Sequence, residues 1–163
     1  MLLIRDAKPT DLDAILAIYN DAVVNTTAVY DYEPRSPQAQ AQWFETKQRS
    51  RYPVLVAAEQ GSVFGFASYG PFRPWPAYLH TMENSIYVAP DQRGRGIGSA
   101  LLGPLVEAAR ANGSHALVAG IDATNEASLR LHARHGFTKV AHFREVGRKF
   151  DRWLDLVFLE RIL

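Results

Sequence analysis

The chain has 163 residues, 47% of them hydrophobic, which is enough to build one domain around a substantial core. Its 18 basic and 17 acidic side chains nearly cancel, which argues against nucleic acid or an anionic membrane as a partner. It has no cysteine, so disulfides, thiolate metal sites and a cysteine nucleophile are excluded. The first residues lack the layout of a signal peptide, and we expect a cytoplasmic protein.

The first third of the chain predicts one strand and two helices. A strand is expected over residues 2–5, and Thr10 before a run with acidic residues predicts a helix with Thr10 as its N-cap. Ser36 followed by Pro37 predicts a second helix that runs to about Gln48, because proline suits the first helical position.

The middle of the chain predicts three strands. Residues 53–59 and 62–69 form a hairpin around Gln60-Gly61, and residues 81–88 form the next strand. Residues 71–76 contain three prolines and are expected to be irregular, because each proline removes a backbone donor.

The last third predicts two helices and three strands. A helix follows the glycines near residue 96 and ends near Asn112; Pro104 inside it is expected to bend it or remove a hydrogen bond. Asn125 is expected to cap a short helix closed by Gly136. The strands are expected at residues 115–121, 137–146 and 153–160. The order βααβββαβαββ predicts an α/β (α+β) domain over residues 1–163, with helices on both faces of a mixed sheet.

The stretch most informative about function contains Gly94, Gly96 and Gly98, between a predicted strand and a predicted helix. Glycines let backbone amides approach a ligand, and a helix N-terminus offers unpaired N–H groups and partial positive charge. Arg93 and Arg95 add full charges, so we predict a phosphate-binding loop; a tight turn without a ligand is the alternative. No lysine follows the last glycine, which excludes a Walker loop, and the loop lies too late in the chain for a dinucleotide fingerprint.

Residues 92–98 resemble the acetyl-coenzyme A pyrophosphate loop of the GCN5-related N-acetyltransferase (GNAT) superfamily, whose Gln/Arg-x-x-Gly-x-Gly/Ala pattern is met by Arg93, Gly96 and Gly98. Residues 125–129 and 135–137 resemble a second motif of that superfamily. The resemblance spans nearly the whole chain. It implies a mostly antiparallel central sheet and acetyl-CoA as co-substrate.

A narrower resemblance is to the phosphinothricin N-acetyltransferase group, which includes methionine sulfoximine and methionine sulfone acetyltransferases. It is carried by residues 18–23, 52–56, 83–88 and 146–150. That group acetylates the α-amino group of small glutamate or methionine analogues, and the resemblance implies the same activity and a homodimer.

Acetyl transfer from a thioester to an amine requires a base for the amine and a donor for the carbonyl oxygen, but no nucleophilic side chain. Glu83 is the candidate base, because it lies on the strand that leads into the glycine loop, where an acidic residue is unusual. Alternation places it on one face with Ser85 and Tyr87. A salt-bridged or strand-end glutamate is the alternative.

The resemblance also implies which residues bind acetyl-CoA, through the backbone of the strand before the loop, through the loop and through the second motif. They are Ile86, Tyr87, Val88, Arg93, Gly94, Arg95, Gly96, Ile97, Gly98, Ser99 and Asn125. For Asn125 the alternative is a helix cap alone, and the two roles are compatible.

Many superfamily members carry a tyrosine near the start of the last helix as a general acid toward the departing thiolate; here the residue is His132. An imidazole titrates near neutrality and is able to donate a proton. A surface or cofactor-contacting side chain is the alternative. His132 and His135 share a helix face but have no acid of fitting geometry, so no metal site is expected.

We expect residues 71–78 to recognise the acceptor, because Arg73 is suited to hold a carboxylate with two parallel hydrogen bonds. The resemblance implies a substrate-binding set of Arg73, Pro74, Trp75, Glu83, Asn84 and Ser85. A rigid surface loop is the alternative for the first three. Lys149 is a weaker candidate for substrate binding, where it would contact the acidic head group of the substrate; solvating a turn is the alternative.

Two other functions fit the same motifs. A non-catalytic coenzyme A-binding module would keep the glycine loop without needing Glu83, and a protein or peptide N-acetyltransferase of the same fold would bind its acceptor in an open groove. Nucleic-acid binding predicts a basic stripe, which the sequence lacks.

Overall fold

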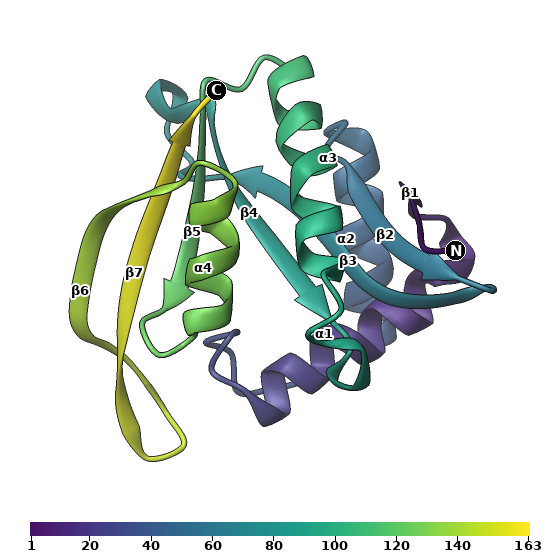
Figure 1. The fold of residues 1–163 in the computed structure, drawn as a ribbon, viewed down its shortest axis with the longest axis horizontal. Helices are drawn as coiled ribbons and strands as arrows, with labels where there is room; N and C mark the ends of the chain where they lie inside the picture. Colours follow the sequence, from purple (N-terminus) through teal and green to yellow (C-terminus); the bar gives the residue numbers. More distant parts are fainter.

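The computed structural model describes residues 1–163, and its strands form a single seven-stranded sheet in the order β1-β2-β3-β4-β5-β7-β6 (Figure 1). The strands are β1 Leu3–Asp6, β2 Val54–Glu59, β3 Ser62–Pro71, β4 Thr81–Val88, β5 Ala116–Asp122, β6 Thr138–Lys149 and β7 Arg152–Ile162. The helices are α1 Leu12–Asn25, α2 Pro37–Arg49, α3 Ile97–Ala111 and α4 Glu126–Arg134. The predicted order of elements is confirmed. Only β4 and β5 pair in parallel, so the sheet is mixed and mostly antiparallel.

Helices cover both faces of the sheet, as the order of elements predicts. In Figure 1, α3 and α4 lie in front of the sheet and α1 and α2 behind it. The front core contains Leu101 and Leu105 of α3, and the rear core contains Ile15 of α1 and Phe44 of α2. No helix is both long and apolar enough to cross a bilayer.

The helix caps show where local sequence was a good guide and where it was not. The Ser36 hydroxyl accepts a hydrogen bond from the amide of Ala39, which confirms the predicted start of α2. The N-cap of α1 is Asp11, and the prediction of Thr10 is wrong. The buried Asp11 carboxylate accepts the Arg5 guanidinium from β1 at 2.7 Å and the Lys8 amide at 2.7 Å, and Thr10 lies inside the short 3-10 turn Pro9–Asp11.

Helix α3 runs without interruption through Pro104. The proline ring is exposed, so the hydrogen bond it removes lies on the side of the helix that water reaches. This exposure explains how α3 tolerates the hydrogen bond lost at Pro104, which the sequence alone did not reveal.

The pairing of β4 with β5 ends early, and this places the site. Only three residue pairs are in register, and the last is Glu83 with Val118. Beyond that point β4 continues to Val88 while β5 diverges from it, as Figure 1 shows. The edge of β4 that faces β5 is therefore without a strand partner after Glu83.

The core makes a direct prediction about stability. Leu102 of α3 is fully buried in the front core. We expect Leu102→Ala to lower the free energy of unfolding by about 2–5 kcal/mol, because a cavity replaces the lost contacts. Leu79, which is 66% exposed, is the control, and its change to alanine should cost less than about 0.5 kcal/mol. Urea unfolding measures both, and equal effects would contradict the assignment of the core.

Candidate active site

The loop between β4 and α3 turns through two glycines in the left-handed region, Gly94 at φ +77° and Gly96 at φ +78°. Side chains are disfavoured there, so the backbone conformation itself requires glycine. A Cβ at either position would meet no atom within 4 Å, so both face open space. Gly98 has another reason: its Cβ would lie 3.0 Å from Cδ2 of Leu131, so its absence lets α4 pack against α3.

A cavity of about 440 Å³ lies at the N-terminus of α3, bordered by α4 and the end of β4. Three arginines and no acidic residue line it: Arg93, Arg130 and Arg134. The first amides of α3 also have no partner within the helix. Positive charge and free amides together make this cavity suited to a polyanion.

Most of the residues predicted to bind the cofactor line this cavity. They are Ile86, Val88, Arg93, Gly94, Gly96, Ile97, Gly98, Ser99 and Asn125. The side-chain oxygen of Asn125 also accepts the amide of Ser128 at 3.1 Å, which confirms the helix cap. Arg130 and Arg134 were missed, although their i, i+4 spacing after Asn125 places them on one helix face.

Two predicted cofactor residues lie elsewhere. Arg95 turns away from the cavity, donates a hydrogen bond to the Gln92 side chain and lies 3.6 Å from Glu59. Tyr87 points to the opposite face of the sheet, where its ring packs 5.2 Å from the ring of Phe66. Tyr87 does not line the arginine-lined cavity.

A second cavity, of about 380 Å³, lies at the other end of the unpaired stretch of β4. The predicted substrate residues Glu83, Asn84 and Ser85 line it together with the loop that follows α1. The other predicted substrate residues are exposed and do not line it: Arg73, Pro74 and Trp75.

Glu83 lies in this second cavity without a hydrogen-bond or ion-pair partner, so it is not the salt-bridged glutamate of the alternative reading. Burial raises the pKa of its carboxyl group, and the positive charge of Arg73 opposes that rise. A Cβ at Gly120 would lie 3.0 Å from Oε1 of Glu83, so glycine on β5 leaves room for the carboxylate. Such a carboxylate is well placed to accept a proton.

His132 is 3% exposed and hydrogen-bonded at both ring nitrogens. Nδ1 lies 2.9 Å from the carbonyl oxygen of Ser128, and Nε2 lies 3.0 Å from Oδ1 of Asn84. The Asn84 amide group donates to the carbonyl of Val118. Two acceptors favour a protonated ring, but burial lowers the pKa of His132 more than the Ser128 carbonyl raises it. The general-acid role stays a prediction.

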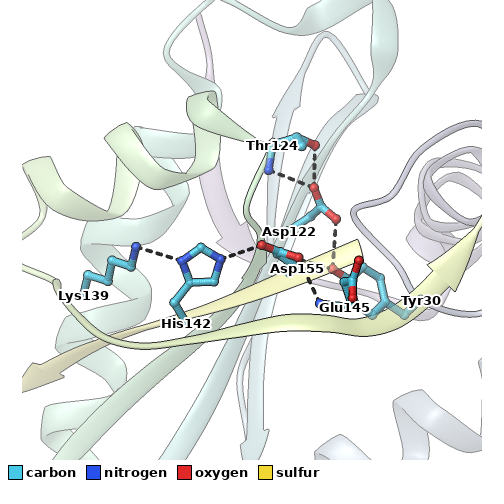
Figure 2. Close-up of polar contacts among 7 residues, drawn as sticks. All are labelled: Tyr30, Asp122, Thr124, Lys139, His142, Glu145 and Asp155. Atoms are coloured by element: carbon cyan, nitrogen blue, oxygen red, sulfur yellow. Dashed lines mark hydrogen bonds and ion pairs between the residues drawn. The ribbon is translucent and has the colours of Figure 1, made fainter. Parts of the chain in front are cut away.

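Asp122 is a second buried carboxylate in this region, and sequence reasoning missed it. Figure 2 shows it between the Tyr30 hydroxyl, which donates to Oδ2 at 2.9 Å, and the Thr124 amide, which donates to Oδ1 at 2.9 Å. Its sequence context is an ordinary strand end, and its partner Tyr30 lies 92 residues away. No local pattern could have found the pair.

The two cavities border a third, narrow cavity between them. A narrow cavity of about 60 Å³ between the diverging strands shares Ile86 and Asn125 with the arginine-lined cavity. It shares Asn84 and Asp122 with the cavity that holds Glu83. A polyanion bound at the glycine loop is therefore able to extend an arm along β4 toward Glu83.

Comparisons with known proteins agree with this geometry. The model of the acetyltransferase (GNAT) family matches residues 13–137. The chain is 50% identical to the L-methionine sulfoximine/L-methionine sulfone acetyltransferase of Pseudomonas aeruginosa, covering 96% of this chain and 92% of that one. It is 40% identical to the phosphinothricin N-acetyltransferase of Streptomyces coelicolor, covering 98% and 95%.

A solved structure extends the agreement to three dimensions. The phosphinothricin acetyltransferase of Sinorhizobium meliloti, in complex with acetyl-CoA, matches with a TM-score of 0.96 and 38% identity, over 99% of this chain and 88% of that one. The family model, the relatives and the solved structure agree, and the chain belongs to the GNAT family of acetyltransferases.

Proposed function

We propose that the protein transfers an acetyl group from acetyl-CoA to the α-amino group of a small amino-acid analogue of the methionine sulfoximine, methionine sulfone or phosphinothricin type. The observation that carries the proposal is the row of adjoining cavities along β4, from the arginine-lined cavity to the unpaired Glu83 carboxylate. The names of the relatives at 50% and 40% identity support the acceptor class.

The residues of the first cavity fit acetyl-CoA as the co-substrate. The amides after Gly94 and the Arg93 guanidinium are suited to the diphosphate, and Arg130 and Arg134 add charge for the remaining phosphate. The unpaired edge of β4 after Glu83 offers backbone groups to an extended amide-containing arm, as an added strand does. When bound, acetyl-CoA supplies an acetyl group activated as a thioester.

Glu83 is the proposed base. Its carboxylate accepts a proton from the acceptor ammonium, directly or through one water, and the free amine then forms the new C–N bond as the C–S bond breaks. The raised pKa of Glu83 brings its proton affinity closer to that of an amine. His132 is proposed as the acid that protonates the leaving sulfur, through an imidazole that also fixes Asn84.

The size of the second cavity favours a small acceptor over a peptide, because about 380 Å³ lies within the range of small-molecule sites. The loop that follows α1 closes one side, where a peptide would need an open groove. A coenzyme A-binding module is also disfavoured, because an unpaired half-buried carboxylate costs stability and serves no purpose in binding alone. Arg73 is the proposed partner of the acceptor carboxylate.

We also propose a homodimer and a cytoplasmic location. The free edge of the sheet, formed by the β6–β7 hairpin, exposes Phe143, Val146 and Trp153, and such an apolar patch supports association. The near-neutral charge and the absence of cysteine are compatible with the cytoplasm.

Coenzyme binding tests the first cavity. We expect Arg93→Ala to weaken coenzyme A binding by roughly tenfold or more, because it removes a charged hydrogen-bond donor. Gly96→Val should also weaken it, because valine is strained at φ +78°. Arg95→Ala is the matched control, since Arg95 turns away, and should change affinity by less than about twofold. Calorimetry that found equal affinities for all three variants would reject the cavity as the coenzyme site.

Glu83→Gln tests the base. We expect turnover to fall by about 10²–10⁴-fold while coenzyme A affinity stays near that of the wild type, because only proton transfer is lost. Thiol release from acetyl-CoA with a panel of amino acids and their sulfur and phosphorus analogues measures the rate. Unchanged turnover would remove Glu83 from the mechanism.

Arg73→Met tests whether the positive charge of Arg73 lowers the pKa of Glu83 and binds the carboxylate of the acceptor. Arg73 lowers the pKa of Glu83, so its loss raises that pKa and leaves less of the carboxylate in its basic form. The acid limb of the kcat/KM profile should therefore move to higher pH. The KM of a carboxylate-bearing acceptor should rise by about tenfold or more, because a charged pair is lost. A profile that stays in place, with an unchanged KM, would place acceptor recognition elsewhere.

A further inference from the structure

The loop between α1 and α2, residues 26–36, forms one wall of the cavity that holds Glu83. Ala28, Val29 and Tyr30 are its lining residues. The far end of the loop is tied to α1, because the Asn20 side chain exchanges hydrogen bonds of 2.9 and 2.8 Å with the backbone of Arg35. The wall itself lies between the two ends and depends on other contacts.

Lys149, the last residue of β6, makes the most unusual of those contacts. Only 5% of it is exposed, and no carboxylate lies within ion-pair distance. Its Nζ donates to the carbonyl oxygen of Val29 at 2.7 Å and to that of Val23. Val23 lies in the last turns of α1, where a positive charge is favourable. Lys149 therefore bonds backbone carbonyls of α1 and the loop after it, and a contact with an acidic head group of the substrate stays a prediction.

The two residues before Lys149 hold the same loop. A Cβ at Gly147 would lie 2.9 Å from the ring of Tyr30, so glycine is needed for the ring to lie flat against β6. The Tyr32 hydroxyl donates to the carbonyl of Arg148. Three successive residues of one strand thus contact the loop between α1 and α2.

The hairpin is shaped to make these contacts. Its register shifts between Phe143 and Gly147, and Glu145 has φ +53°. Figure 2 shows Asp155 of β7 holding this bulge, with Oδ1 accepting the Glu145 amide at 2.9 Å and Oδ2 lying 2.8 Å from Nε2 of His142. A bulge redirects the strand beyond it, here toward the loop.

We propose that Lys149 is a positioning residue: its ammonium holds residues 26–30 as the wall of the acceptor site and so determines affinity for the acceptor rather than for the coenzyme. The proposal rests on the proposed function, because it takes the cavity of Glu83 as the acceptor site. Without the ammonium, the carbonyls of Val23 and Val29 lose their donor and the wall loses its support. Thr26, Thr27 and Ala28 border a neighbouring cavity together with Arg93, but Val29, Tyr30 and Lys149 line neither that cavity nor the arginine-lined one.

The test compares Lys149→Met with Lys149→Arg, which keeps a charged donor, and with Arg152→Met. Arg152 pairs with Lys149 across the hairpin and is exposed, so its variant removes a charge without removing a loop contact. Hydrogen exchange of residues 26–32 reports on the wall. Steady-state kinetics with methionine sulfone as acceptor give KM and kcat, and calorimetry gives the affinity for coenzyme A.

For Lys149→Met we expect exchange in residues 26–32 and the acceptor KM each to rise by about tenfold, because two buried carbonyls lose their donor. Turnover at saturation and coenzyme A affinity should stay within about threefold of the wild type, because neither the base nor the coenzyme cavity is touched. Lys149→Arg should bring the acceptor KM part of the way back to the wild-type value. Arg152→Met should leave the acceptor KM and the exchange of residues 26–32 at their wild-type values. Tyr32→Phe removes only the hydrogen bond from Tyr32 to the carbonyl of Arg148. It should raise exchange in residues 26–32 and the acceptor KM by less than Lys149→Met does. If Lys149→Met does not fold, Tyr32→Phe replaces it in the test.

Unchanged exchange in residues 26–32 would overturn the proposal, and so would faster exchange with an unchanged acceptor KM. Parallel losses of acceptor and coenzyme affinity would also overturn it, because they would indicate a general structural effect. These outcomes are distinct from failure of the proposed function, which would appear as a wild-type protein that acetylates no acceptor of the panel.

Discussion

The site depends on one buried amide at the point where β4 and β5 separate. The Asn84 amide group donates to the carbonyl of Val118 at 3.2 Å, and its Oδ1 lies 3.0 Å from Nε2 of His132. Val118 is the last residue of β5 in register with β4. An unpaired buried carbonyl would cost about 1–3 kcal/mol. Asn84 supplies the missing partner, so the strands are able to part inside the core. The same side chain joins the gap to α4 through His132.

The separation places both halves of the chemistry on one strand. One end of β4 leads into the glycine loop and the N-terminus of α3, and the other carries Glu83. Because a central strand is rigid, the distance from the amides of the glycine loop to the proposed base is set by the sheet rather than by flexible loops. In our proposal the loop that follows α1 adds a wall to the acceptor site, and the β6–β7 hairpin holds that wall.

Much of this could be predicted from the sequence, where the determining contacts are local. Hydrophobic periodicity and turn residues predict the order of elements, Ser36 predicts the start of α2, and the glycine pattern predicts the phosphate-binding loop. In each case the side chain acts within a few residues of its own position, so neighbouring residues carry the information.

What the sequence could not predict depends on residues far apart in the chain. Tyr30 meets Asp122 across 92 residues, and Lys149 reaches Val29 across 120. A lysine reads as a surface residue because its charge is costly to bury, and only the fold shows that helix and loop carbonyls compensate for it. Gly98 was expected to serve the phosphates, but its tight fit against Leu131 became visible only once α4 was placed.

The most direct test of the central claim is a crystal structure with both coenzyme A and methionine sulfone bound. We predict that the diphosphate lies on the amides that follow Gly94, that the sulfur lies in the gap between β4 and β5, and that the acceptor nitrogen lies about 3 Å from Glu83 or from a water bound to it. A coenzyme bound outside the gap, or a Glu83 carboxylate turned away from the acceptor nitrogen, would contradict it.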